Sequence, residues 1–149
     1  MTPDERWLST PRESEALGAA VARFLRPGEA ICLWGPLGAG KTTLARGLIR
    51  QLAGDQDIPS PTFTLVQTYA GADFPVAHFD LYRIERPGEL EELGLDDALD
   101  QGVAVIEWPE RLGARLPPDR LDIRLQVEGE GRKARLERHG RWNGRSIDL

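Results

Sequence analysis

The chain has 149 residues, of which 40% are hydrophobic and 29% are charged, and its formal net charge is −5 at pH 7. A chain of this length can bury about two-thirds of its unfolded surface, so we expect one domain over residues 1–149. The negative net charge argues against a protein that binds nucleic acid over its whole surface. No apolar run approaches the ~20 residues of a membrane span and no secretory signal is evident. We therefore expect a cytoplasmic protein without membrane contact.

A first helix is expected to begin after Thr10. Thr10, Pro11 and Glu13 provide an N-cap, a proline at the first helical position and the acidic residue of a capping box. Apolar side chains then recur at helical spacing until Pro27-Gly28: Leu17, Ala20, Val21, Phe24 and Leu25. This stripe is typical of a helix that packs against a sheet.

The stretch Gly35-Pro36-Leu37-Gly38-Ala39-Gly40-Lys41-Thr42-Thr43 matches the phosphate-loop pattern. The apolar run at 30–34 predicts a buried parallel strand before it, and apolar residues at helical spacing predict a helix after it that ends near Gly54. The glycines let backbone N–H groups surround phosphates, and the helix start adds partial positive charge. We expect a nucleoside triphosphate here, with Lys41 at the β- and γ-phosphates and the Thr42 hydroxyl on Mg²⁺.

Two further apolar runs each end in a carboxylate. Residues 76–79 lead to Asp80, and residues 103–106 lead to Glu107. In phosphate-loop proteins a carboxylate at the end of a neighbouring strand holds Mg²⁺ or orients the attacking water. We expect the two acids to share this work, one serving the metal and the other the nucleophile. The alternative is that each is simply a surface residue at the end of a strand.

Two connecting regions have more than one interpretation. Residues 60–64, before a strand predicted at 65–69, carry threonines that could sense the γ-phosphate, or they form a plain connector into an edge hairpin. The acidic segment 87–99 is predicted to form a helix and a shorter second helix. These helices are either merely exposed or a docking surface.

The C-terminal part is predicted to be a β-hairpin, because apolar and polar residues alternate over 121–127 and again around Ala134 and Leu136. Such alternation is unusual in a buried parallel strand, so we expect an α/β fold with a mixed, mainly parallel sheet, flanked by helices and antiparallel at one end. From Arg132 to Arg145 the chain has six basic residues and one acid. This run is either a solvated strand and tail or a local contact for the phosphates of nucleotide or RNA.

The expected nucleotide is ATP. The Asn-Lys-x-Asp stretch by which GTPases read guanine is missing, since the only asparagine is Asn143. Three classes remain open: an ATPase, a small-molecule kinase, or a nucleotide-dependent switch with negligible catalysis. A kinase would need a lid with arginines, for which the candidates are Arg111, Arg115 and Arg120.

Four blocks together resemble the bacterial TsaE (YjeE) family: residues 35–43, 60–69, 78–83 and 107–109. The resemblance implies a phosphate-loop ATPase, weak by itself, that serves threonylcarbamoylation of the adenosine next to the anticodon in tRNAs reading adenine-initial codons. It also implies two partner proteins, TsaB and TsaD, of which TsaD transfers the threonylcarbamoyl group. The tRNA would be contacted indirectly or through the basic strand.

The same resemblance implies roles for individual residues. The ATP phosphates would be held by Gly38, Ala39, Gly40, Lys41, Thr42 and Thr43. Thr42 and Glu107 would bind Mg²⁺, and Asp80 would be the essential acid, with Lys41 and Thr43 as further catalytic residues.

The nucleotide would have further neighbours outside the loop. The resemblance implies that Trp108 lies beside it, that Arg132 reaches it, and that Pro11 lines the adenine side. Pro11 offers no polar side chain, so any contact with adenine would be apolar or through its carbonyl group. Pro36 stands where the family usually has an acidic or amide residue, and we expect no loss of binding because the phosphate donors come mainly from later in the loop.

Overall fold

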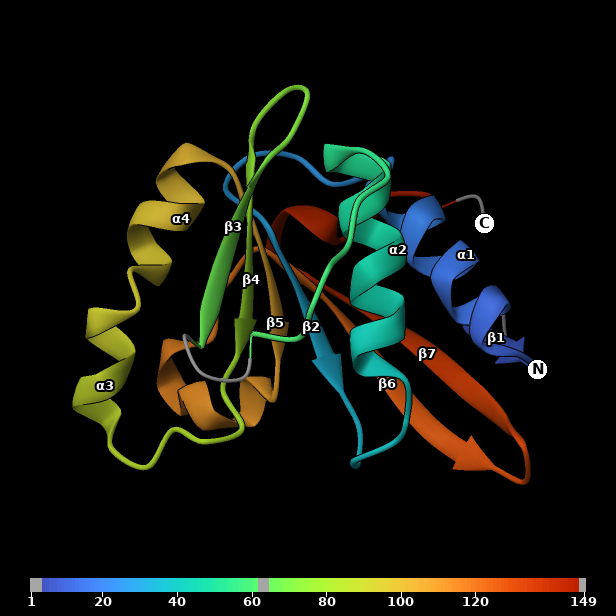
Figure 1. Cartoon of the computed structure of the whole chain (residues 1–149). Coiled ribbons are helices and arrows are strands. Elements are labelled where there is room, and N and C mark those ends of the chain that lie inside the picture. The colour runs from blue at the N-terminus through green and yellow to red at the C-terminus, as the bar shows by residue number, and fades with distance from the viewer. Residues whose placement is uncertain (1–3, 62–64, 148–149) are drawn as a thin grey trace.

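The computed structural model describes residues 4–61 and 65–147, which form a mixed sheet with helices on both faces (Figure 1). Within these residues the seven strands lie in the order β1-β7-β6-β2-β5-β4-β3. They are β1 Glu5–Leu8, β2 Ala30–Trp34, β3 Val66–Ala70, β4 Pro75–Asp80, β5 Val103–Glu107, β6 Arg120–Glu128 and β7 Gly131–His139. The helices are α1 Pro11–Ala22, α2 Lys41–Ala53, α3 Pro87–Glu92 and α4 Leu95–Gln101, with short 3₁₀ helices η1 Pro109–Arg115 and η2 Gly140–Trp142. The expected α/β class is confirmed.

The middle of the sheet is parallel and both of its edges are antiparallel. Strands β6, β2, β5 and β4 run in one direction. At one edge β3 pairs antiparallel with β4, and at the other β7 pairs antiparallel with both β6 and β1. The expected antiparallel portion at the hairpin end is present, and the pair of β3 and β4 adds a second one at the other edge.

Strand β6 shows why the alternation of apolar residues was a poor guide to direction. It forms the predicted hairpin with β7, yet its other edge is parallel to β2, with Leu121 opposite Ile31. Its alternate residues Ile123 and Leu125 are buried in the core under α1 and α2, whereas the opposite face carries polar side chains such as Arg124. Alternation reports how the two faces of a strand are covered, and it does not report the direction of the neighbouring strand.

Helices cover both faces of the sheet (Figure 1). Two hydrophobic cores lie on these two faces. One packs α1 and α2 against the sheet through residues such as Leu17, Leu48 and Val105. The other packs α3, α4 and η1 against the opposite face, with Phe79 and Ile106 at its centre. None of the helices in the described ranges is long and apolar enough to cross a membrane.

Helices α1 and α2 pack unusually closely because each presents a glycine to the other. A Cβ atom at Gly18 would lie 2.1 Å from the carbonyl oxygen of Leu44, and one at Gly47 would lie 2.1 Å from that of Glu15. Any larger residue must therefore push the backbones apart. This contact holds α2, which begins directly after the loop that follows β2, against α1.

The start of the chain contains both a confirmed and a missed element. Helix α1 begins at Pro11 as predicted, and the Thr10 hydroxyl accepts a hydrogen bond from the Glu13 N–H at 3.2 Å. It ends at Ala22, before Pro27-Gly28, although Leu25 beyond its end is still buried. Strand β1 was not predicted, because four residues of mixed polarity give no pattern and only pairing with β7 makes them a strand.

Candidate functional site

The glycine-rich loop lies between the end of β2 and the start of α2, as the sequence predicts. Gly38 and Gly40 have φ angles of 79° and 95°, a region that side chains with a Cβ atom rarely adopt. Gly40 caps α2 without a side-chain hydrogen bond to the helix start. The first N–H groups of a helix have no partner within the helix, so this end is suited to an anion.

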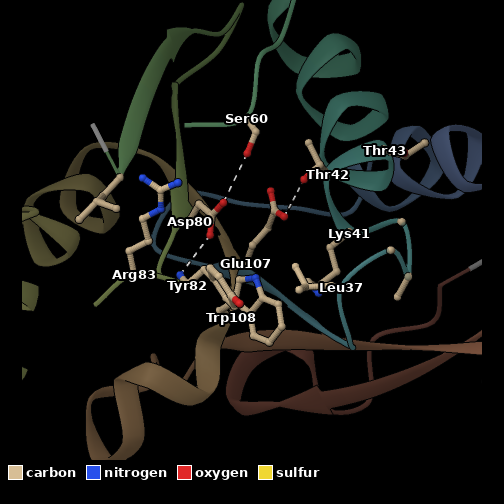
Figure 2. Close-up of a pocket in the computed structure, with 14 residues that line it drawn as sticks. Leu37, Lys41, Thr42, Thr43, Ser60, Asp80, Tyr82, Arg83, Glu107 and Trp108 are labelled. Carbon is tan, nitrogen blue, oxygen red and sulfur yellow. Dashed lines mark hydrogen bonds between the residues drawn. The ribbon is translucent and has the colours of Figure 1, made fainter. Parts of the chain in front are cut away.

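A pocket of about 440 Å³ opens in front of this loop at the carboxyl ends of β4 and β5 (Figure 2). Its lining brings together most of the predicted site: Gly38, Ala39, Gly40, Lys41, Thr42, Thr43, Asp80, Glu107 and Trp108. It also includes Leu37, Ser60, Leu65, Tyr82 and Arg83. Residues from five separate parts of the chain thus face one hollow.

Lys41 is buried against its own loop. Its ammonium group donates to the carbonyl oxygens of Gly35 and Pro36, the latter at 2.9 Å, and lies 3.9 Å from the ring centroid of Trp108. Burial lowers the pKa of Lys41, and the nearby carboxylates of Glu107, Glu110 and Asp80 partly oppose that shift. The positive charge is therefore held in a partly dry place beside the loop.

Thr42 and Glu107 form the pair of oxygen donors that the sequence assigns to a metal. The Thr42 hydroxyl donates to Oε1 of Glu107 at 2.8 Å, although the two residues are 65 positions apart. Glu107 is only 2% exposed, and its second oxygen, Oε2, lies 2.7 Å from Nε2 of His78. A carboxylate and a hydroxyl at the edge of a pocket are ligands that suit Mg²⁺.

Asp80 stands beside Glu107 at the end of the neighbouring parallel strand, because the register of β4 and β5 makes them partners. Its Oδ1 accepts a hydrogen bond from the Tyr82 N–H at 3.1 Å, and its Oδ2 accepts one from the Ser60 hydroxyl at 3.3 Å. Figure 2 shows both carboxyl groups turned toward the same space. The predicted pair of acids therefore meets in three dimensions.

Trp108 has a strained backbone, and its ring lines one side of the pocket. Its φ of 61° and ψ of 50° are left-handed, and a non-glycine residue held in that region costs on the order of 1–3 kcal/mol. Its ring packs against that of Tyr82 with centroids 4.8 Å apart. Together these contacts place a flat apolar surface next to Lys41.

A second hollow of about 150 Å³ lies on the other side of the loop. Pro11, Thr43 and Arg132 line it together with Gly38 and Gly40. Arg132 donates to the carbonyl oxygen of Gly38 at 3.0 Å, so a residue of β7 reaches the loop from 94 positions away. In Figure 2 the side chain of Thr43 points toward α1, away from Asp80 and Glu107.

Most side chains of the basic run near the C-terminus form ion pairs with acids of the same chain. Four of its members pair with acids elsewhere in the chain: Lys133 with Glu5, Arg138 with Asp4, Arg141 with Asp119 and Arg145 with Glu29. Arg135 pairs with Glu137, the acid within the run itself. Arg132 is the member that reaches the phosphate loop.

The arginines considered for a kinase lid are also engaged elsewhere. Arg111 donates to the carbonyl oxygen of Tyr82, Arg115 pairs with Glu91, and Arg120 pairs with the buried Asp122. The acidic segment forms α3 and α4, separated by Gly94 in a left-handed conformation. Residues 62–64, which include the threonines of the switch hypothesis, lie outside the described residues.

His78 contacts a predicted site residue, and the sequence assigned it no role of its own. It is 0% exposed and contacts Glu107 from the middle of β4. A signal was present, since His78 lies two residues before Asp80 and therefore faces the same side of the sheet. A histidine within an apolar run is nevertheless a common core residue, and its spacing alone does not separate the two interpretations.

A buried parallel strand, a glycine-rich loop, a helix start and two adjacent strand-terminal acids define a phosphate-loop α/β protein. The family model described as "Threonylcarbamoyl adenosine biosynthesis protein TsaE" matches residues 8–136, and the chain belongs to this family. The resemblance found in the sequence is therefore confirmed.

Individual relatives agree with this assignment. The chain is 38% identical to the tRNA threonylcarbamoyladenosine biosynthesis protein TsaE of Rickettsia felis, over 85% of this chain and 74% of the relative. It is 39% identical to the protein of the same name from Bacillus subtilis, over 80% of this chain and 75% of the relative. The crystal structure of Bacillus subtilis YdiB is similar, with a TM-score of 0.77 at 31% identity, covering 93% of this chain and 88% of that one.

Proposed function

We propose that this protein is a weak, partner-dependent ATPase that serves threonylcarbamoylation of the adenosine next to the anticodon in tRNAs reading adenine-initial codons. Membership of the TsaE family and the names of the relatives support the pathway. The observation that carries the ATPase proposal is that Asp80 and Glu107 meet the phosphate loop in one pocket. A phosphate loop with carboxylates beside it to hold the metal and orient water is suited to ATP hydrolysis.

ATP would be held by the loop and by residues on both sides of it. The N–H groups of residues 38–43 and the Lys41 ammonium would contact the phosphates. Arg132 and Pro11 line the second hollow, which suits the nucleoside end, and Trp108 would flank the nucleotide on the other side. Thr43 lines both hollows, but its side chain points away from Asp80 and Glu107 (Figure 2), so we assign it to nucleotide binding ahead of catalysis.

Mg²⁺ would be held by Thr42 and Glu107. Their oxygens are already 2.8 Å apart at the edge of the pocket, and hard oxygen ligands of this kind fit the ion. When bound, Mg²⁺ would neutralise charge on the phosphates. Lys41 adds a fixed positive charge from the protein, held beside the loop by its contacts with Gly35 and Pro36.

Asp80 is the proposed catalytic acid–base residue. Its carboxyl group faces the pocket and is oriented by the Tyr82 N–H and the Ser60 hydroxyl. An ionised carboxylate in this position would orient a water molecule and accept its proton as the water attacks the γ-phosphate. Glu107 is less suited to this task, because both of its oxygens are already engaged.

The partners that we propose are TsaB and TsaD, in the cytoplasm, with tRNA contacted indirectly. Most of the basic run is paired with acids of the same chain, which disfavours a direct tRNA contact through β7. A small-molecule kinase is disfavoured because Arg111, Arg115 and Arg120 make other contacts.

A pull-down tests the proposed assembly. The tagged protein is mixed with purified TsaB and TsaD, with and without ATP and Mg²⁺. We expect both partners to be retained more strongly when nucleotide is present. No retention under either condition would contradict the partner-dependent role.

A further inference from the structure

We propose that His78 is a positioning residue, which holds the Glu107 carboxylate in the orientation needed for Mg²⁺. This inference rests on the proposed function, because it concerns the same metal–nucleotide site. Its basis is a chain of three side chains: Thr42 contacts one oxygen of Glu107 at 2.8 Å, and His78 contacts the other at 2.7 Å. Each oxygen of the carboxylate therefore has its own partner.

The sheet register explains how the three residues meet. His78 on β4 is opposite Val105 on β5, and Glu107 lies two residues further along β5 on the same face. Diagonal neighbours of this kind are within reach of long side chains. Thr42 approaches from the first turn of α2, the helix that covers this face. The contact is thus built from three elements at the end of the sheet nearest the loop.

The chemistry of the contact fixes which atom carries the proton. An ionised carboxylate can only accept hydrogen bonds, so Nε2 of His78 is the donor. The other ring nitrogen, Nδ1, is buried and has no hydrogen-bond partner among the described residues. A fully buried ring whose polar contact in the described structure is with Glu107 is poorly explained by packing alone.

Holding one oxygen has a consequence for the other. A carboxylate with a single partner can rotate about its last bond and exchange its two oxygens. With Oε2 held by His78, Oε1 stays directed toward Thr42 and the pocket. Groups that orient metal ligands in this way typically contribute about tenfold to a hundredfold in metal affinity.

Two substitutions separate positioning from packing. In His78→Gln the side-chain amide nitrogen takes roughly the place of Nε2 and can still donate to Glu107. In His78→Asn the amide nitrogen takes roughly the place of Nδ1 and cannot reach it. Both variants are polar amides of similar size, so their difference reports the position of the donor.

The measurement is the Mg²⁺ concentration that gives half of the metal-dependent gain in ADP affinity, determined by calorimetry. We expect this midpoint to rise by about tenfold to a hundredfold in His78→Asn and to stay near the wild-type value in His78→Gln. His139→Asn is the matched control. Nε2 of His139 lies 3.0 Å from Oδ2 of Asp122, at the end of β7 away from Arg132, so the midpoint should not change.

Several outcomes would overturn the proposal. If the midpoint is unchanged in His78→Asn, or shifts equally in both His78 variants, His78 does not position the metal ligand. Should His78→Asn fail to fold, a large shift in a folded His78→Gln would still contradict the proposal. ADP affinity measured in EDTA reports on the phosphate loop alone and should be equal in all variants. If the wild type bound no ADP either in EDTA or with Mg²⁺, the proposed function would be contradicted as well.

Discussion

Asp80 and Glu107 are register partners at the carboxyl ends of the parallel strands β4 and β5, yet their carboxyl groups have different surroundings. Glu107 is buried and engaged through both oxygens by Thr42 and His78. Asp80 is only half-buried and is oriented by a hydroxyl and a backbone N–H. Two adjacent acids with such different contacts are suited to different tasks, and we assign the metal to Glu107 and the water to Asp80.

Replacing Asp80 should separate binding from turnover. In Asp80→Ala we expect ATP affinity close to the wild-type value, because the phosphate loop is untouched. ATP hydrolysis in the presence of the partner proteins should fall by about 10²–10⁴-fold, the usual contribution of a general base. The exposed Asp100, on α4, provides a control in Asp100→Ala. A normal rate in the Asp80 variant would show that this carboxylate is not the catalytic group.

Replacing Lys41 should remove nucleotide binding. In Lys41→Ala the loop loses the positive charge that we assign to the β- and γ-phosphates, so calorimetry should detect no binding of ATP. The chain has one other lysine, Lys133, which lies on β7 and pairs with Glu5 of β1. Lys133→Ala should bind ATP normally. Equal ATP affinity in Lys41→Ala and the wild type would refute the assignment of the loop.

Nucleotide affinity should decline as the pH rises, and the decline should begin at a lower pH than it would with a lysine of ordinary pKa. Burial lowers the pKa of Lys41, so the side chain loses its proton at a lower pH than in an unfolded chain. Phosphates favour the charged form. Binding is therefore strongest below this lowered pKa and weakens as the pH rises through it. Affinities measured over a series of alkaline pH values test this.

The control for the pH dependence is Lys41→Arg, since arginine keeps its charge throughout the range. Whatever its absolute affinity, this variant should show no decline over the same pH interval. A decline of the same size in Lys41→Arg would mean that another group is responsible.

The C-terminal segment should contribute strongly to stability through one buried ion pair. Arg145 contacts both oxygens of Glu29 at 2.8 and 2.7 Å, and the side chains are 10% and 0% exposed. Arg145→Ala leaves the Glu29 carboxylate buried without its partner, which typically costs about 3–5 kcal/mol. Chemical denaturation measures the loss in the free energy of unfolding.

Arg135→Ala is the comparison for Arg145→Ala. Arg135 is 57% exposed and pairs with Glu137 on the surface, so its loss should cost at most about 1 kcal/mol. If the two variants lose similar amounts of stability, the pair formed by Arg145 and Glu29 does not have the importance that its burial indicates.

The central part of the site could be predicted because its residues stand at the ends of apolar runs. Asp80 and Glu107 each follow a buried strand, and the glycine-rich loop joins a strand to a helix. Carboxyl ends of parallel strands meet at one edge of a sheet, so local patterns were sufficient to bring these groups together.

Other parts depend on contacts that no local pattern contains. The four residues of β1 become a strand only by pairing with β7, and β6 is parallel to β2 despite its alternating residues. Arg132 reaches Gly38 across 94 positions; the basic run left a phosphate contact open, and the family resemblance pointed to Arg132 itself. His78 was recognised as part of a motif, but its contact with Glu107 required the register of β4 and β5.

The most direct test of the proposed role is phosphate release from ATP by the purified protein, alone and mixed with TsaB and TsaD. The proposed function predicts slow release by the protein alone, a clear increase with both partners, and loss of that increase in Asp80→Ala. Release that is unaffected by the partners, or transfer of the γ-phosphate to a small acceptor molecule, would contradict a partner-dependent ATPase.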